Sequence, residues 1–400
     1  MIERKEYLSE LISLREKQII KVVTGVRRCG KSTLFKLYQD YLLSTGVLPE
    51  QIISINLEDL DFEELLDYKK LYAYIKERLC KDKYTYIFLD EIQNCKDFEK
   101  AVDSLFIKEN TDVYITGSNA YMLSGELATL LSGRYVTIAM LPLSFKEYVI
   151  ANNESNKSTR EHFADYLRFG SFPYLAAISK DEPIMESYID GIYNTILVKD
   201  VAKREGITDI SLLESIVKVM ASSIGSPVST KKISDTINSA GRKTSVNSID
   251  SYMKALCDAY IFYKVDRFDI KGRQHLKTLG KYYIVDTGIR NLLLSSGASD
   301  IGHLIENVAY FELVRRGYKV NIGKLSEKEV DFVAKNSNGL EYYQISASVL
   351  DETTLRRELS PLESIQDHFP KILLTLDEVP KNANFNGIRH LNLIDWLLDE

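Results

Sequence analysis

Residues 18–33, QIIKVVTGVRRCGKST, decide the fold of this chain. The first part, residues 18–24, is rich in β-branched residues and predicts a buried strand that stops at a glycine. Apolar residues at helical spacing then predict a helix over residues 31–41. The turn between them therefore lies where backbone N–H groups and the N-terminus of a helix can bind a phosphate group.

This turn fits the pattern G-x-x-x-x-G-K-[ST] at every fixed position, which predicts a P-loop. Its glycines let the backbone approach phosphate oxygens closely. We expect Lys31 to contact the β- and γ-phosphates of ATP and the Ser32 hydroxyl to ligate magnesium. The residues expected to surround the nucleotide are Gly25, Val26, Arg27, Arg28, Cys29, Gly30, Lys31, Ser32 and Thr33.

The acidic partner of this loop is predicted at residues 86–91, YIFLDE. An apolar strand that ends in Asp90 places a carboxylate near Ser32, where magnesium can bind. The adjacent Glu91 is expected to polarise the attacking water as a general base. Acids at the end of an apolar strand are common, but downstream of a P-loop they indicate a Walker B motif.

Two further polar residues are candidates for the same site. Asn119 ends the segment TGSN after the next strand and could sense the γ-phosphate; the alternative is a loop asparagine that forms a turn. Arg134 begins the following strand and could stabilise transition-state charge, in cis or from a neighbouring subunit. The alternative for Arg134 is a solvated arginine at a strand end.

Strand-like and helical segments alternate through the first part of the chain, which predicts an α/β fold with a parallel sheet covered on both faces. Ligands of such sheets bind at the carboxyl ends of the strands, where both phosphate motifs fall. The predicted strands are residues 18–24, 52–55, 84–89, 112–116 and 135–139, and the predicted helices are residues 31–41, 68–79, 98–107 and 122–131.

The rest of the chain changes character twice. A polar stretch at residues 152–160 indicates a boundary, and residues 161–204 are mostly helical in pattern. Three helical patterns followed by two strand-like runs, at residues 212–222, 230–239, 246–259, 261–268 and 281–285, are typical of a winged helix-turn-helix. A helix over residues 304–316 and strands over residues 329–333 and 341–345 then predict a small α/β unit.

The segments GVRRCGKST, YIFLDE, TGSN and SGRYVTIAMLPLSFKEY, in that order, resemble the bacterial and archaeal AAA+-related ATPases of the extended P-loop superfamily. Residues 169–173, FGSFP, resemble a Gly-Gly-Phe-Pro element of that family, with Ser171 replacing its second glycine. The resemblance implies a P-loop ATPase core at residues 1–150, a helical lid at 151–206, a winged helix at 207–298 and a restriction-endonuclease-like unit at 299–400.

Nucleases similar to that last unit need an acid on one strand and an acid-x-Lys sequence on the next, to hold magnesium and activate water. Glu306 and Asp331 are candidates for the first acids. The second strand has Gln344 and Ser346 in place of the acid and the lysine. The resemblance therefore implies a degenerate domain, and nuclease activity is not expected.

The net charge of −6 argues against a protein that coats nucleic acid over its whole surface. Residues 225–281 nevertheless carry a local charge of +6, which can mark a contact face or an ordinary surface. Lys271, Arg273 and Lys277 are the candidate DNA contacts within this region. The alternative is a winged helix that docks onto protein.

These patterns predict a magnesium-dependent ATPase whose nucleotide state moves the C-terminal domains. The alternative is a slow-turnover ATP-dependent switch or DNA-binding regulator that acts through the winged helix. ATP and magnesium are the expected ligands, DNA or a protein partner remains open, and an oligomer is compatible with the sequence. No apolar run is long enough to span a bilayer and no signal-like segment begins the chain, so we expect a cytoplasmic protein without a membrane partner.

Overall fold

The computed structural model describes residues 2–120, 131, 133–153, 156–178, 181–272, 274–294, 301–380 and 382–399, with only the backbone of residues 274–278. The chain divides into two compact units, Met1–Pro142 with Asp258–Tyr260, and Leu143–Cys257 with Ile261–Glu400. Within the described ranges, every helix is too short or too polar to cross a membrane.

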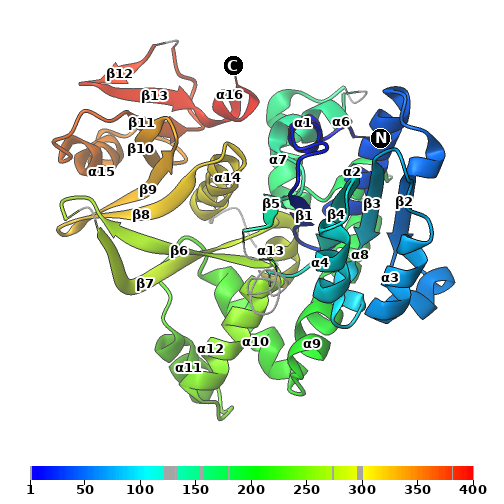
Figure 1. Cartoon of the computed structure of the whole chain (residues 1–400). Helices are drawn as coiled ribbons and strands as arrows, with labels where there is room; N and C mark the ends of the chain where they lie inside the picture. Colours follow the sequence, from blue (N-terminus) through cyan, green and yellow to red (C-terminus); the bar gives the residue numbers. More distant parts are fainter. Residues whose placement is uncertain are drawn as a thin grey trace. The chain divides into compact units, whose positions relative to one another are not determined.

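The first unit is built on a five-stranded parallel sheet with the order β2-β3-β4-β1-β5 (Figure 1). Its strands are β1 (Ile20–Thr24), β2 (Ile52–Asn56), β3 (Thr85–Asp90), β4 (Thr111–Gly117) and β5 (Tyr135–Ala139). β1 lies between β4 and β5, with Thr24 paired to Gly117 and to Ala139. All strands run the same way, which confirms the predicted parallel sheet and the α/β class of this unit.

Alternating side chains of these strands pack against helices on the two faces of the sheet. Ile87 and Leu89 of β3 belong to an apolar cluster with α3 (Tyr68–Lys76) and α4 (Phe98–Phe106). Phe88 points the other way, and its ring lies 5.2 Å from that of Phe35 on α2 (Lys31–Ser44). Burying both faces is what strands of near-continuous apolar sequence require. The N-terminal helix α1 (Lys5–Ser13) packs against α2.

A charged pair is buried at the amino edge of this sheet. The Lys21 ammonium group of β1 forms an ion pair with Asp112 of β4, and neither side chain is exposed to solvent. Asp112 Oδ2 also accepts hydrogen bonds from the Tyr114 hydroxyl and the Glu16 backbone N–H, both at 2.7 Å. Burial lowers the pKa of Lys21, and the charge of Asp112 opposes that shift. The charge of Asp112 therefore offsets the cost of burying the Lys21 ammonium group.

The second unit begins with a series of helices, and a carboxylate binds the turn that follows the second of them. Its first helices are α6 (Phe145–Ala151), α7 (Thr159–Phe169), α8 (Glu182–Thr195), a π-helix at Ile196–Ala202 and α9 (Lys203–Glu205). Gly170 follows α7 with φ 82°, and a Cβ there would lie 2.1 Å from an Asp286 oxygen. Asp286 accepts hydrogen bonds from the backbone N–H and the hydroxyl of Ser171, at 2.6 and 3.0 Å. This carboxylate joins the FGSFP segment to the start of α13 (Thr287–Leu294).

The three predicted helices and the hairpin of the middle segment are present as α10 (Ile210–Ser222), α11 (Thr230–Ser239), α12 (Val246–Asp258), β6 (Phe262–Asp269) and β7 (Gln274–Ile284). The hairpin is not separate from the C-terminal strands. β6 pairs in parallel with β8 (Lys319–Leu325), through Arg267 with Ile322 and Asp269 with Lys324. The assignment of these elements to a winged helix stays a prediction.

These strands form one eight-stranded sheet with the order β12-β13-β11-β10-β9-β8-β6-β7, coloured from yellow-green to red in Figure 1. The remaining strands are β9 (Lys328–Asn336), β10 (Gly339–Ile345), β11 (Lys371–Thr375), β12 (Asn384–Phe385) and β13 (Ile388–Asn392). Apolar residues of α15 (Glu352–Glu363) join a core cluster on this sheet. Helices α14 (Ile301–Arg315) and α16 (Leu393–Leu398) complete the unit.

Candidate functional site

The glycine-rich loop joins β1 to α2, as the sequence predicts, and its glycines meet specific steric demands. A Cβ on Gly25 would lie 2.0 Å from the Met140 carbonyl oxygen, and Gly25 has φ 150°. Gly30 is the N-cap of α2 with φ 105°, a left-handed conformation that favours glycine. Because Gly30 has no side chain, the N-terminal N–H groups of α2 carry no side-chain cap and point toward the loop.

Lys31 lies inside the loop rather than on the surface, and its side chain is only 3% exposed. Its Nζ donates to the carbonyl oxygens of Gly25 at 3.0 Å and of Val26 at 3.3 Å. The same nitrogen lies 3.7 Å from Glu91 Oε1. The structure thus brings the lysine of the first motif into contact with the second acid of the other motif.

Asp90 ends β3 beside the loop, where two hydroxyl groups act on its carboxylate. Thr116 Oγ1 donates a hydrogen bond to it, and the Ser32 hydroxyl lies close enough to lower its pKa. Burial raises the pKa of Asp90, and the neighbouring Glu91 charge adds to this effect, while the two hydroxyl groups oppose it. Unfavourable burial of negative charge at this position favours a bound cation.

The donor set fits magnesium. A hydroxyl oxygen from Ser32 and a carboxylate from Asp90 are hard oxygen ligands. Mg²⁺ typically takes one or two ligands from the protein, and phosphate oxygens and water molecules fill the rest of its coordination shell. Among the described residues, no cluster of three or more His, Cys, Asp or Glu side chains could hold a metal ion by itself. The ion would therefore depend on these two side chains together with the nucleotide.

Glu91 follows directly and has φ 52°, an uncommon left-handed conformation for a residue with a side chain. Its backbone N–H donates to Thr116 Oγ1 at 2.9 Å. Burial favours a higher pKa for Glu91, but the Lys31 charge and a hydrogen bond from Gln93 outweigh burial and hold the pKa below its usual value. The group is therefore ionised at neutral pH, as a general base must be.

The other two candidates lie in different places. Asn119 is buried and comes just after β4, whose last residue pairs with Thr24 next to the loop. Arg134 precedes β5 at the amino edge of the sheet, where it pairs with Asp103 and covers the Phe106 ring at 5.7 Å. Because β5 runs parallel to β1, the start of β5 is opposite the loop, so the expected contact of Arg134 with the nucleotide in cis is wrong.

Several side-chain contacts that support the loop were not predicted from the sequence. Arg4 is buried and donates to the Cys29 carbonyl at 3.0 Å and to the Leu141 carbonyl at 2.6 Å. Arg27, within the loop, pairs with Glu58 at 2.8 Å. An arginine in an N-terminal helix region carries no local signal that it will reach a loop 25 residues later.

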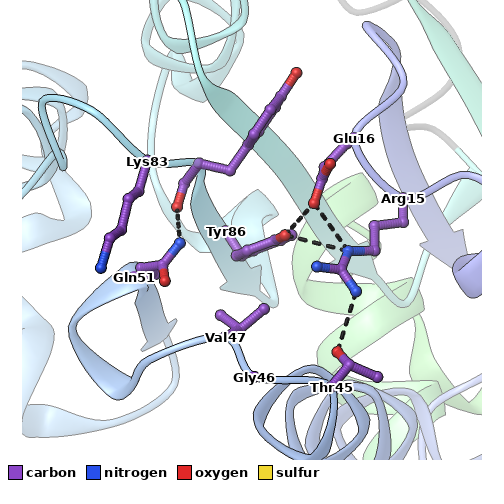
Figure 2. Close-up of a pocket in the computed structure, with 9 residues that line it drawn as sticks. Arg15, Glu16, Thr45, Gly46, Val47, Gln51, Lys83 and Tyr86 are labelled. Atoms are coloured by element: carbon purple, nitrogen blue, oxygen red, sulfur yellow. Dashed lines mark hydrogen bonds and ion pairs between the residues drawn. The ribbon is translucent and has the colours of Figure 1, made fainter.

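A hollow of about 300 Å³ lies at the amino edge of the same sheet. Figure 2 shows the side chains that line it. It is lined by the end of α2, the start of β3 and the segment before β1, including Arg15, Thr45, Gln51 and Tyr86. Arg15 donates to Thr45 Oγ1 at 3.1 Å and to the Tyr86 hydroxyl at 3.2 Å. Asp90 lies at the opposite end of β3, so this hollow is separate from the phosphate loop.

In the second unit, the sheet places charged side chains around Glu306. Its Oε1 accepts from the Lys281 ammonium at 3.1 Å and from the Tyr283 hydroxyl at 2.6 Å. Burial raises the pKa of Asp331 well above its ordinary value, and the Glu306 charge raises it further. The two candidate acids, Glu306 and Asp331, are thus close enough to interact, and Lys281 of β7 forms an ion pair with Glu306.

Gln344 is also near this group, as its side-chain oxygen accepts from the Asp331 backbone N–H at 3.3 Å. Its amide nitrogen donates to Glu358 at 2.9 Å. Of the predicted DNA contacts, Lys271 is exposed and lies 3.4 Å from Ser326 Oγ. Arg273 and the side chain of Lys277 lie outside the described residues.

Comparison with known proteins adds the following similarities. Residues 17–149 match the family model of the AAA domain, and residues 160–300 match that of a domain of unknown function. An uncharacterized protein of Haemophilus influenzae is 38% identical, covering 100% of this chain and 99% of its own length. One from Methanocaldococcus jannaschii is 31% identical, covering 86% of this chain and 78% of its own. A Walker-type ATPase of Pyrococcus abyssi is similar in structure, with a TM-score of 0.46, 15% identity and coverage of 73% of this chain and 96% of its own.

Proposed function

The chain belongs to the family of these Haemophilus influenzae and Methanocaldococcus jannaschii relatives and contains an AAA domain, and from this premise we propose that it binds and hydrolyses ATP. One observation carries the proposal. Lys31 on the loop lies 3.7 Å from Glu91, the residue that follows Asp90 at the end of β3. Two motifs far apart in the sequence therefore converge at the carboxyl ends of β1 and β3, where ligands of parallel sheets bind.

Each residue has a role that follows from its chemistry. The loop amides and Lys31 bind the phosphates of the nucleotide, and Ser32 and Asp90 would hold magnesium. When bound, magnesium neutralises charge on the phosphate oxygens. Glu91 is ionised and accepts a proton from the attacking water. Asn119, close to the loop in the sheet register, is proposed to contact the γ-phosphate.

Phosphate release from ATP, with and without magnesium, tests this function directly. We expect Lys31→Ala to weaken nucleotide binding, because the lysine is the cation inside the loop. Glu91→Gln should retain binding and lose turnover by about 100-fold or more, since general-base groups contribute roughly 10²–10⁴-fold. Wild-type protein that is folded but has no affinity for adenine nucleotide with magnesium would overturn the proposal.

The local charge of +6 over residues 225–281 supports a second candidate, in which nucleotide state regulates binding of DNA by this segment. In that case affinity for duplex DNA falls steeply with salt, and Lys271→Glu weakens it. If the purified protein retains one nucleotide per chain and releases negligible phosphate, the result favours this second candidate, a switch with slow turnover. Rapid turnover that is indifferent to DNA favours the simple ATPase.

A further inference from the structure

The carboxylate of Glu91 is held by a second residue that lies just beyond it in the chain. Gln93 follows β3 in a short 3-10 helix (Ile92–Asn94), and its Nε2 donates to Glu91 Oε2. The Ser118 hydroxyl, after β4, lies near the Glu91 carboxylate and favours its charged form. Gln93 Nε2 and Ser118 Oγ lie 3.4 Å apart, so the two side chains meet at the same group.

The orientation of the Gln93 amide is fixed by Glu91. If the amide were turned over, its oxygen would face a carboxylate, and two acceptors repel each other. In the orientation present, Gln93 Oε1 is buried and accepts no hydrogen bond from any residue that the structure describes. A buried acceptor without a donor is unfavourable. The hydrogen bond to Glu91 therefore contributes more free energy than the buried Gln93 Oε1 loses by having no donor.

This arrangement leaves one carboxylate oxygen for the phosphate site. Gln93 holds Oε2, the Glu91 backbone N–H is held by Thr116, and Oε1 faces Lys31 at 3.7 Å. A carboxylate on a free side chain would sample several rotamers, whereas a base is effective only when it is directed at the water that it deprotonates. The Gln93 amide restricts Glu91 to the rotamer that points toward the loop.

We propose that Gln93, assisted by Ser118, is the positioning residue that directs the Glu91 carboxylate at the phosphate site. The inference rests on the proposed ATP hydrolysis and adds a required group that neither phosphate motif contains. Gln93 acts through Glu91 and makes no contact with the nucleotide in this role. Its loss should therefore lower kcat and leave binding of ATP nearly unchanged.

The test measures kcat, KM and nucleotide Kd for Gln93→Ala and for Gln93→Glu, which keeps the side-chain shape but removes the donor. Both variants should lose about 10-fold or more in kcat, since small misplacements of a reacting group cost up to roughly 100-fold, with Kd within about 2-fold of wild type. Gln39→Ala is the matched control, because Gln39 on α2 donates to Ser54 and lies away from the loop. It should retain the wild-type kcat.

A double-mutant cycle separates positioning from a general structural effect. In single-turnover measurements, Gln93→Ala should add no further loss to Glu91→Gln, because the group that it positions is already inactive. A full, independent loss in that background would overturn the proposal, as would wild-type kcat in both Gln93 variants. If wild type releases no more phosphate than Lys31→Ala, the proposed hydrolysis fails and this inference fails with it.

Discussion

Removal of the buried carboxylate of Asp112 should destabilise the first unit strongly. In Asp112→Ala the Lys21 ammonium group remains in a fully buried position without its ion-pair partner. Breaking a buried pair in this way typically costs about 3–5 kcal/mol. The Tyr114 hydroxyl and the Glu16 N–H also lose an acceptor at 2.7 Å, and each lost partner costs about 1 kcal/mol or more if water does not replace it. We therefore expect a loss of about 4 kcal/mol or more.

Hydrogen–deuterium exchange of the β1 and β4 amides is the suitable assay, since a chain with two compact units need not unfold in one step. Exchange in these strands should accelerate by roughly 1,000-fold for 4 kcal/mol if it proceeds through unfolding of the unit. Replacing both charges, as Lys21→Met with Asp112→Leu, should be less damaging than Asp112→Ala. Glu64→Ala, which removes an exposed pair with Lys70, should have no measurable effect. A change below about 1 kcal/mol in Asp112→Ala would refute the reasoning.

Three further outcomes are expected. Cys29 is buried and burial raises the pKa of its thiol, so in native protein it should react with iodoacetamide far more slowly than the partly exposed Cys80, by peptide mass spectrometry. Gly25→Ala should abolish ATP binding in a filter or calorimetric assay, because its Cβ would lie 2.0 Å from the Met140 carbonyl. Burial lowers the pKa of His390, so stability of the second unit should be full above about pH 6.5, fall as the pH drops from there, and level off below the lower folded-state pKa. Urea midpoints from the fluorescence of the single tryptophan check this, and His390→Gln should flatten the decline.

The first unit was predictable because its signals are local. A run of β-branched residues, a turn that requires glycine and a helix at regular spacing define β1, the loop and α2 within residues 18–44. Asp90 and Glu91 were identified by the same local logic at the end of β3. Of the predicted helix at residues 122–131, residues 122–130 lie outside the described residues, so this prediction stays untested.

Other features depend on contacts that a sequence pattern does not contain. The approach of Arg4 to Cys29 and the capture of Glu91 by Gln93 both need the assembled loop. The position of Arg134, in contrast, could have been predicted from its place before a parallel strand. An arginine that precedes a parallel strand lies at the amino edge, whereas ligands bind at the carboxyl edge.

The second unit shows more clearly what a sequence pattern cannot predict. The patterns identified the hairpin of β6 and β7 and the later strands β9 and β10, but they gave no means of pairing them. Strand partners distant in sequence are selected by side-chain packing across the finished sheet. The pairing of β6 with β8 therefore emerged only from the structure.

The shared sheet also constrains how this protein could be shortened or recombined. A fragment that ended near residue 298 would leave β6 without β8, exposing unpaired backbone N–H and C=O groups along a strand edge. Such a fragment would tend to self-associate, and a foreign module joined at that position would inherit the same open edge. Exchange of parts between relatives should thus keep residues 261–400 together as a single inherited block.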